Sequence, residues 1–220
     1  NVLFNVMRGG LFESAYTINR NDFVAYLNQV SLNTARRFDA EVRAWPEMMD
    51  YQDFMQRVSR LMDSDLERVA LEYLPLSFSR RHGDPSRPWN VFNIYTRDAK
   101  GRRLVSYEGN WRDIFQNWEA LAYSYPAFIQ GMITKFLDAS TVDAYNPYRI
   151  SKEGIDWEVI EENDPWSYIG YWGDHQIIYL QKLLEHWEKH QPKAMLAQWN
   201  RPIYTYANVP YRIRDYASIL

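Results

Sequence analysis

Apolar side chains recur at spacings of three and four residues along much of the chain, a pattern typical of helices that bury one face. The first such stretch follows Asn19 and Asn21, and either side chain can cap the start of a helix. Its apolar positions are Phe23, Tyr26, Leu27, Val30 and Phe38. We therefore predict a helix that begins at about residue 20.

A second stretch begins at Tyr51 and has its apolar positions at Phe54, Met55, Val58, Leu61 and Met62. Ser64 and Glu67 then form a Ser-x-x-Glu pair, which is a signature of a helix start. The helix is expected either to kink or to restart at this point, and Pro75 marks its end.

The middle of the chain predicts a long loop and one hairpin. Residues 79–90 contain a glycine and two prolines, so they are expected to lack regular structure. Residues 91–96 and 103–107 are short runs of β-prone side chains on either side of residues 98–101. This pair is the β-hairpin that the sequence predicts.

The second half returns to the helical spacing. Asn110 can cap one helix and Pro126 can open another, and we expect the two helices to form a hairpin. Residues 140–172 are expected to be mostly irregular, because they are dense in Pro, Gly and Asp. Asp174 can cap a last helix with a wide apolar stripe over 177–187. The predicted fold class is all-α with one small β-hairpin.

Length and charge narrow the possible partners. The chain has 220 residues, 46% of them hydrophobic, which suits a single domain over residues 1–220. Its formal net charge of -3 gives no basic surplus for nucleic acid. No apolar run is long enough to span a bilayer, so we expect neither a nucleic-acid nor a membrane partner. Zero cysteines fit a reducing compartment, which favours a cytoplasmic location.

Aromatic residues make up 16% of the chain and include 9 Trp and 17 Tyr. Both side chains combine an apolar face with a polar tip, which suits ligands such as sugars. A tyrosine-rich core or a protein interface would have the same composition. Composition therefore predicts either a carbohydrate site or extensive aromatic packing.

One candidate cluster lies in the loop at residues 79–90. It contains Arg81, His82, Arg87 and Trp89. The planar donors of arginine suit vicinal hydroxyls, carboxylates and phosphates. The alternative is that these charges pair with one another and cap neighbouring helices.

A second cluster lies at the entrance of the helix after Asn110. Its members are Trp111, Arg112, Asp113, Trp118 and Glu119. Asp113 shares a helix face with Gln116 and Asn117, so this polar stripe can line a groove. The alternative is a solvated helix face on which Asp113 stabilises the helix dipole.

A third cluster combines carboxylates with indoles over residues 154–176. Its members are Asp156, Trp157, Glu158, Trp166, Trp172 and Asp174. Inverting glycosidases need one carboxylic acid and one carboxylate, and an apolar ring can keep a carboxyl protonated near neutral pH. We predict Asp156 and Glu158 as the catalytic candidates. Asp174 can instead be a helix cap.

The four histidines do not have the His-Glu-x-x-His spacing of a zinc site, and no G-x-S-x-G turn is present. The histidine spacing therefore argues against a metal site, and the missing turn argues against Ser-His-Asp catalysis. No metal or other cofactor is expected.

The residues from Arg80 to Trp187 resemble those of six-hairpin glycosidases, the (α/α)6 toroids that include trehalase, glucoamylase and processing glucosidases. The resemblance rests on NWRDIFQNWEAL, on a helix that begins PAFIQGMI, and on the GIDWE segment. It implies that Arg112, Asp113, Trp118 and Glu119 line a sugar pocket, and that Asp156 is the general acid.

A complete toroid has twelve helices and needs well over 300 residues at ordinary helix and loop lengths. The chain is therefore expected to be a fragment of a larger (α/α)6 barrel protein. The predicted function is cleavage of an α-glucoside or related oligosaccharide. The alternatives are a non-catalytic polysaccharide-binding domain and a helical interaction domain that binds the rest of its parent chain.

Overall fold

The computed structural model describes residues 11–12, 14–79, 97–102, 104–147, 149–157, 171–172, 177–208 and 217. Most of these residues are helical, as predicted. The helices are α2 (Arg20–Val30), α3 (Leu32–Arg43), α4 (Tyr51–Arg60), α5 (Ser64–Glu72), α6 (Trp111–Ser124), the 3₁₀ turn η1 (Pro126–Phe128), α7 (Ile129–Asp138), α8 (Ile177–His190) and α9 (Pro192–Gln198).

Side-chain caps fix several of these helix starts. The Asn19 side chain accepts hydrogen bonds from the backbone N–H groups of Asn21 (2.8 Å) and Asp22 (3.2 Å), so Asn19 rather than Asn21 caps α2. The helix after Tyr51 restarts, because Met62 has a φ of 51° and interrupts it. The cap of α5 is Asp63 rather than Ser64.

Short strands are more numerous than the sequence predicted. They are β1 (Leu11–Phe12), β2 (Thr17–Asn19), β3 (Met48–Asp50), β4 (Leu76–Ser79), β5 (Tyr107–Asn110), β6 (Tyr145–Asn146), β7 (Arg149–Ser151), β8 (Ile155–Asp156) and β9 (Tyr171–Trp172). The largest sheet has the order β1-β4-β5-β7-β8. Only β4 and β5 are parallel within it.

The predicted hairpin differs from the observed strands. Its turn is present, because Gly101 has a φ of 77° and donates to the backbone oxygen of Asp98. Residues 104–106 are not in a strand, and β5 begins at Tyr107, where it pairs with β4 and β7. The predicted partner strand at 91–96 lies outside the described residues. The β7–β8 hairpin lies in a segment that was predicted to be irregular.

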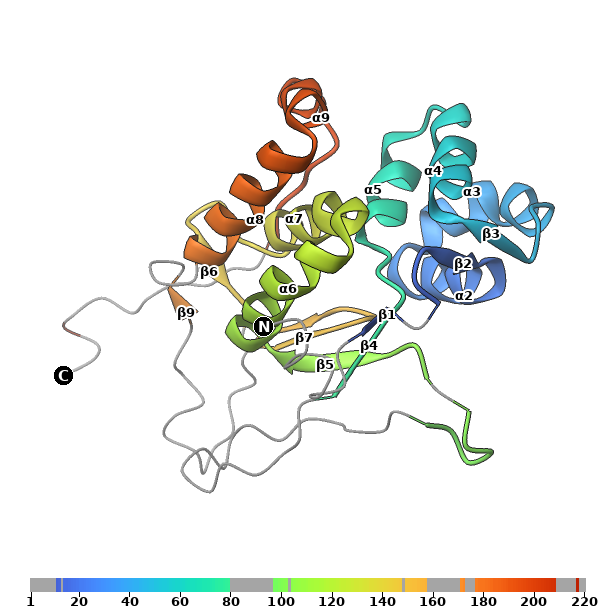
Figure 1. The fold of residues 1–220 in the computed structure, drawn as a ribbon, viewed down its shortest axis with the longest axis horizontal. Coiled ribbons are helices and arrows are strands. Elements are labelled where there is room, and N and C mark those ends of the chain that lie inside the picture. Colours follow the sequence, from blue (N-terminus) through green and yellow to red (C-terminus); the bar gives the residue numbers. More distant parts are fainter. Residues whose placement is uncertain are drawn as a thin grey trace.

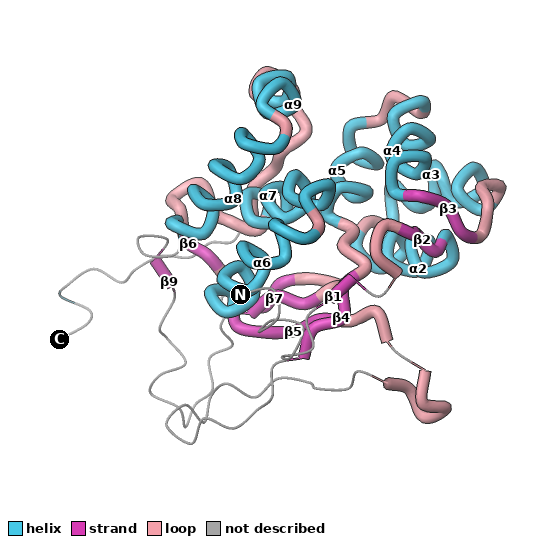
Figure 2. Tube along the Cα trace, viewed as in Figure 1, coloured by secondary structure: helices cyan, strands magenta, loops and turns pink. Residues whose placement is uncertain are grey.

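The helices form two groups beside this sheet (Figures 1 and 2). Helices α2 to α5 form one group, and α6 to α9 form the other, with α6 packed on β5 and β7. The groups meet where α5 packs against α7. The described part of the chain contains no closed ring of helical hairpins, so the toroid prediction is not confirmed by this arrangement.

Aromatic side chains join the two groups through the sheet. Phe12 of β1 stacks on Phe128 of η1 with their ring centroids 4.1 Å apart. Tyr51 of α4 lies 4.6 Å from Phe128, and Tyr125 lies 4.9 Å from Phe12. Close backbone packing adds to this joint, because a Cβ on Gly131 of α7 would lie 2.3 Å from the backbone oxygen of Leu71. Much of the aromatic content is therefore used in the core.

Candidate functional site

The two tryptophans of α6 that were predicted to bind sugar lie inside the core. Trp111 and Trp118 are both fully buried. Trp111 contacts Phe136 of α7 at a centroid distance of 5.1 Å, and Trp118 meets Tyr107 of β5 edge to face at 5.4 Å. The reason is that α6 is covered by the sheet on one side and by α7 and α8 on others. The structure thus leaves neither ring an open face for a sugar.

The polar stripe of α6 is also largely buried. Asp113 and Asn117 are only 7% and 8% exposed, and the Asn117 side-chain amide donates to the backbone oxygen of Asp113 at 2.5 Å. Arg112 is half-buried. Asp113 and Asn117 therefore pack within the fold, whereas Gln116 on the same helix face is exposed.

Glu119, which was predicted with Trp111, Arg112, Asp113 and Trp118 as a sugar-binding cluster, contacts polar side chains of α8. Its carboxylate accepts a hydrogen bond from Lys182 of α8 at 2.8 Å. Beside it, the rings of Tyr123 and His186 meet edge to face at 4.0 Å. Burial lowers the pKa of His186, and the nearby Glu119 carboxylate opposes this effect. The four side chains form a polar contact between α6 and α8.

Asp156 belongs to β8 and is exposed at the sheet edge. Its carboxylate accepts a hydrogen bond from Arg149 Nε at 2.6 Å, and Arg149 Nη1 also donates to Glu108 at 2.7 Å. The Asp156 side chain is 54% exposed. Its neighbour Trp157 is half-buried. Asp156 is thus part of a surface ion-pair cluster across β5, β7 and β8.

Several predicted site residues lie outside the described residues. They are Arg81, His82, Arg87, Trp89, Glu158, Trp166 and Asp174. Trp172 lies in β9, where its backbone is paired with Tyr145 of β6. These residues stay predictions.

Two buried lysines form a polar cluster that the sequence did not predict. Lys152 donates to Asp22 of α2 at 2.7 Å, and the Tyr73 hydroxyl donates to the other oxygen of Asp22 at 2.5 Å. Lys135 donates to the backbone oxygen of Lys152 at 3.0 Å and lies 5.5 Å from the ring centroid of Tyr26. Burial lowers the pKa of Lys135 to about 8. These contacts hold α2 and α5 against α7 and the sheet.

A carboxyl pair formed by buried Asp138 and half-buried Glu72 lies next to the lysines. Asp138, at the end of α7, accepts a hydrogen bond from the backbone N–H of Thr205 at 2.8 Å. Burial and the neighbouring carboxyl of Glu72 raise the pKa of Asp138 to about 9. The sequence signal for this cluster is the presence of Lys135 and Asp138 in the largely apolar helix α7.

An open groove runs along the outer surface of α4. Its volume is about 580 Å³. The lining residues are Gln52, Met55, Gln56, Ser59 and Arg60 of α4 and Glu67 of α5. The sequence predicted no binding role for these residues: Met55 was expected on the buried face of a helix, and Glu67 was expected at a helix start.

The described part of the chain contains no group of three or more metal-ligating side chains. None of its helices combines the length and the apolar character that crossing a bilayer would require.

Comparison with known proteins gives one family match. Residues 12–75 match the family model of glycoside hydrolase family 149 insertion domain 1. No curated protein matches the chain. The chain therefore contains a segment similar to an insertion domain of a glycoside hydrolase family, and this similarity extends over less than half of its length.

The limits of the match coincide with two paired strands. The matched segment begins at Phe12 in β1 and ends at Pro75, directly before β4. Phe12 is the antiparallel partner of Leu76, the first residue of β4. The segment that contains α2 to α5, called the insert below, thus leaves the sheet and returns to it at neighbouring positions.

Proposed function

We propose that this chain is a non-catalytic part of a carbohydrate-active enzyme and that residues 12–75 form a helical insert docked on its sheet. The observation that carries the proposal is the pairing of Phe12 with Leu76 at the two ends of the matched segment. An inserted domain needs its two ends close together, so that the host chain can continue across it. The insert meets this requirement.

The described candidates for chemistry support an accessory role. Glycoside cleavage requires a carboxylic acid aimed at the glycosidic oxygen, with a second carboxylate beside it. Asp156 is instead held by Arg149 at an exposed strand edge. Trp111 and Trp118 stabilise the core, so they do not offer stacking surfaces. The described residues therefore support a proposal in which they do not supply the reacting carboxylates.

The insert is docked firmly rather than tethered. The Asp22–Lys152 ion pair, the stacked rings of Phe12 and Phe128, and the close approach of Gly131 to Leu71 all cross between the insert and the rest of the fold. Such an insert can hold a fixed surface near the substrate of its host. The resemblance of the later residues to six-hairpin glycosidases makes α-glucosides the first substrates to test.

The test is hydrolysis of a panel of aryl α- and β-glycosides by the full-length enzyme and by its Asp156→Asn variant. We expect equal rates, because Asp156 only forms a surface ion pair. The matched control is Arg149→Met, which breaks the same pair without changing a carboxylate. A rate loss of more than 100-fold in Asp156→Asn, with Arg149→Met active and both variants folded, would show that Asp156 takes part in catalysis and would overturn the proposal.

A further inference from the structure

We infer that the groove along α4 is a binding subsite for a short neutral oligosaccharide. The inference rests on the proposed function and extends it by assigning a ligand to the insert. The residues that line the groove belong to the segment that matches the insertion domain, and they lie far from Asp156 in the sequence.

The first wall of the groove is the outward face of α4. Its buried face carries Tyr51, Phe54 and Val58, which pack into the core. The groove residues of α4 occupy positions 52, 55, 56, 59 and 60, which follow the outward side of the helix over about two turns. Met55 lies where this side borders the buried face, because it also packs against the core. An outward helix face is usually convex, whereas here a second wall makes it concave.

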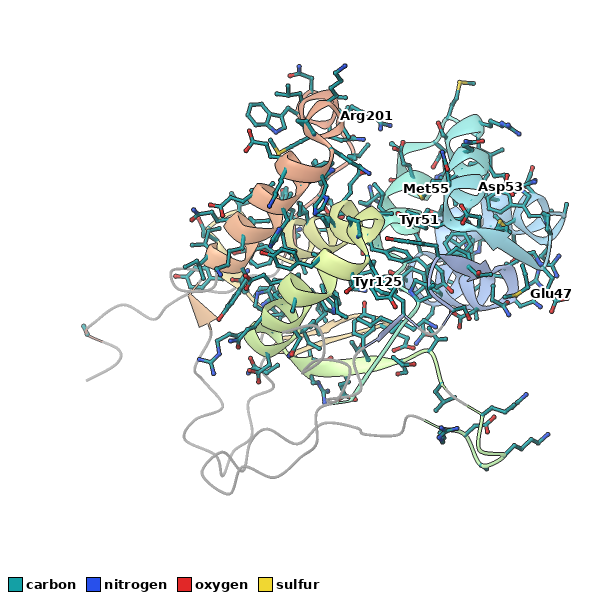
Figure 3. The ribbon with its side chains drawn as sticks, viewed as in Figure 1. Glu47, Tyr51, Asp53, Met55, Tyr125 and Arg201 are labelled. Carbon is teal, nitrogen blue, oxygen red and sulfur yellow. The ribbon has the colours of Figure 1, made fainter. Side chains whose placement is uncertain are left out.

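That second wall is fixed by residues from distant parts of the chain. Glu67 of α5 accepts a hydrogen bond from Arg201 Nη1 at 2.7 Å, and the second Arg201 nitrogen contacts the other carboxylate oxygen. Figure 3 labels Arg201 beside α9 and Met55 near α4. The segment after Arg201 is anchored by Ile203, which is buried, and by Thr205, which donates to Asp138. The wall is thus preorganised.

The polar side chains of the first wall are available to a ligand. Within the described residues, the side chains of Gln52, Gln56, Ser59 and Arg60 form no hydrogen bond or ion pair. Amide and hydroxyl groups both donate and accept, and a guanidinium can bridge neighbouring hydroxyls. These groups repeat at about one helical turn, 5.4 Å, a spacing comparable to the length of one pyranose ring.

The apolar and charged residues of the groove also fit a neutral sugar. Met55 is half-exposed and offers a polarisable surface for the C–H face of a ring. The charge of Glu67 is compensated by Arg201, so the second wall does not carry an unpaired carboxylate. The groove is open to solvent along its length, and its volume of about 580 Å³ gives a short oligosaccharide room to lie along α4. A di- or trisaccharide therefore matches both the size and the chemistry of the groove.

The experiment is calorimetric titration of the full chain with maltotriose and with cellotriose. We compare the wild type with a Gln52→Ala/Gln56→Ala double variant, in which only exposed side chains are shortened. The control is Gln116→Ala, an exposed glutamine on α6 outside the groove. If two hydrogen bonds are lost at about 1 kcal/mol each, affinity should fall by about tenfold or more in the double variant, with no change in the control.

The titrations can either support or refute the subsite. Binding by the wild type and Gln116→Ala, together with weakened binding by the double variant, supports the subsite. If the wild type binds neither trisaccharide, or if the double variant binds as well as the wild type, the subsite is refuted. The aryl-glycoside assay of Asp156→Asn is independent of this result, so failure of the subsite is distinguishable from failure of the proposed accessory role.

Discussion

Gly131→Ala tests the joint between the insert and the rest of the fold. Gly131 lies in α7, where it faces the C-terminal part of α5. In an isolated helix, the change from Gly to Ala would stabilise by about 1 kcal/mol. In this structure the new Cβ would lie 2.3 Å from the Leu71 backbone oxygen and 3.1 Å from Leu74 Cδ2. The contact with Leu71 is too short to be tolerated without movement.

The expected cost follows from what must move. The atom in the way is a backbone oxygen, so rotating a side chain cannot relieve the clash. Helices α5 and α7 must separate by roughly 1 Å, and the packing between them is weakened. Overpacking of this kind costs about 1–3 kcal/mol, which exceeds the gain in helix propensity. We expect the free energy of unfolding to decrease by about 1–3 kcal/mol.

The assay is urea denaturation followed by far-UV circular dichroism, together with thermal melting. A domain of this size should lose about 2–4 °C in Tm for each kcal/mol. Gly154→Ala is the control, because a Cβ there has no neighbour within 4 Å, and its effect should stay within about 0.5 kcal/mol. If Gly131→Ala proves as stable as the wild type, the close approach of α5 and α7 does not exist in solution.

Three further predictions address the core, the ion pair and the carboxyl pair. Trp118→Ala should lower the free energy of unfolding by about 3–5 kcal/mol, whereas Trp199→Ala, at a 70% exposed position, should change it by less than about 0.5 kcal/mol in the same urea assay. Asp22→Asn leaves the Lys152 ammonium buried without its carboxylate, so it should cost about 3 kcal/mol by urea denaturation; a cost below about 0.5 kcal/mol would contradict the buried pair. The pKa of Asp138 is about 9 in the folded state and about 4 in the unfolded state, so between these two pH values only the folded state holds the proton. The free energy of unfolding should therefore fall as the pH rises from about 4 to about 9. In urea titrations from pH 5 to 8, Asp138→Asn should reduce this loss of unfolding free energy by up to about 1.4 kcal/mol per pH unit. If the variant loses stability with pH as steeply as the wild type, the pKa of Asp138 is not raised.

The helices were the most predictable part of the fold, because their signals are local. Asn19 and Asn110 cap helices as the sequence indicated, and the helix after Tyr51 restarts near Ser64. The strands were harder to predict, because runs of two to four residues are too short for an alternating pattern to stand out. The sequence therefore placed Tyr107 at the end of a predicted strand and the next three residues of β5 at the entrance of a helix.

The candidate site depended on information that the sequence does not contain. The spacing of Trp111 and Trp118 showed that they share a helix, but it could not show that the sheet and α7 would cover them. Likewise, the groove along α4 depends on the contact between Glu67 and Arg201, which are 134 positions apart. Such contacts arise from tertiary packing, and no local sequence pattern predicts them.

The adjacency of Phe12 and Leu76 also bears on how such a protein can change over evolutionary time. A recombination event with breakpoints at these two positions would remove or exchange everything between them, while the order of the remaining strands would be preserved. Variation in the length of α2 to α5 would likewise leave the hydrogen-bond register of β4, β5 and β7 unaltered. The strand order of the sheet therefore does not depend on what lies between these two positions.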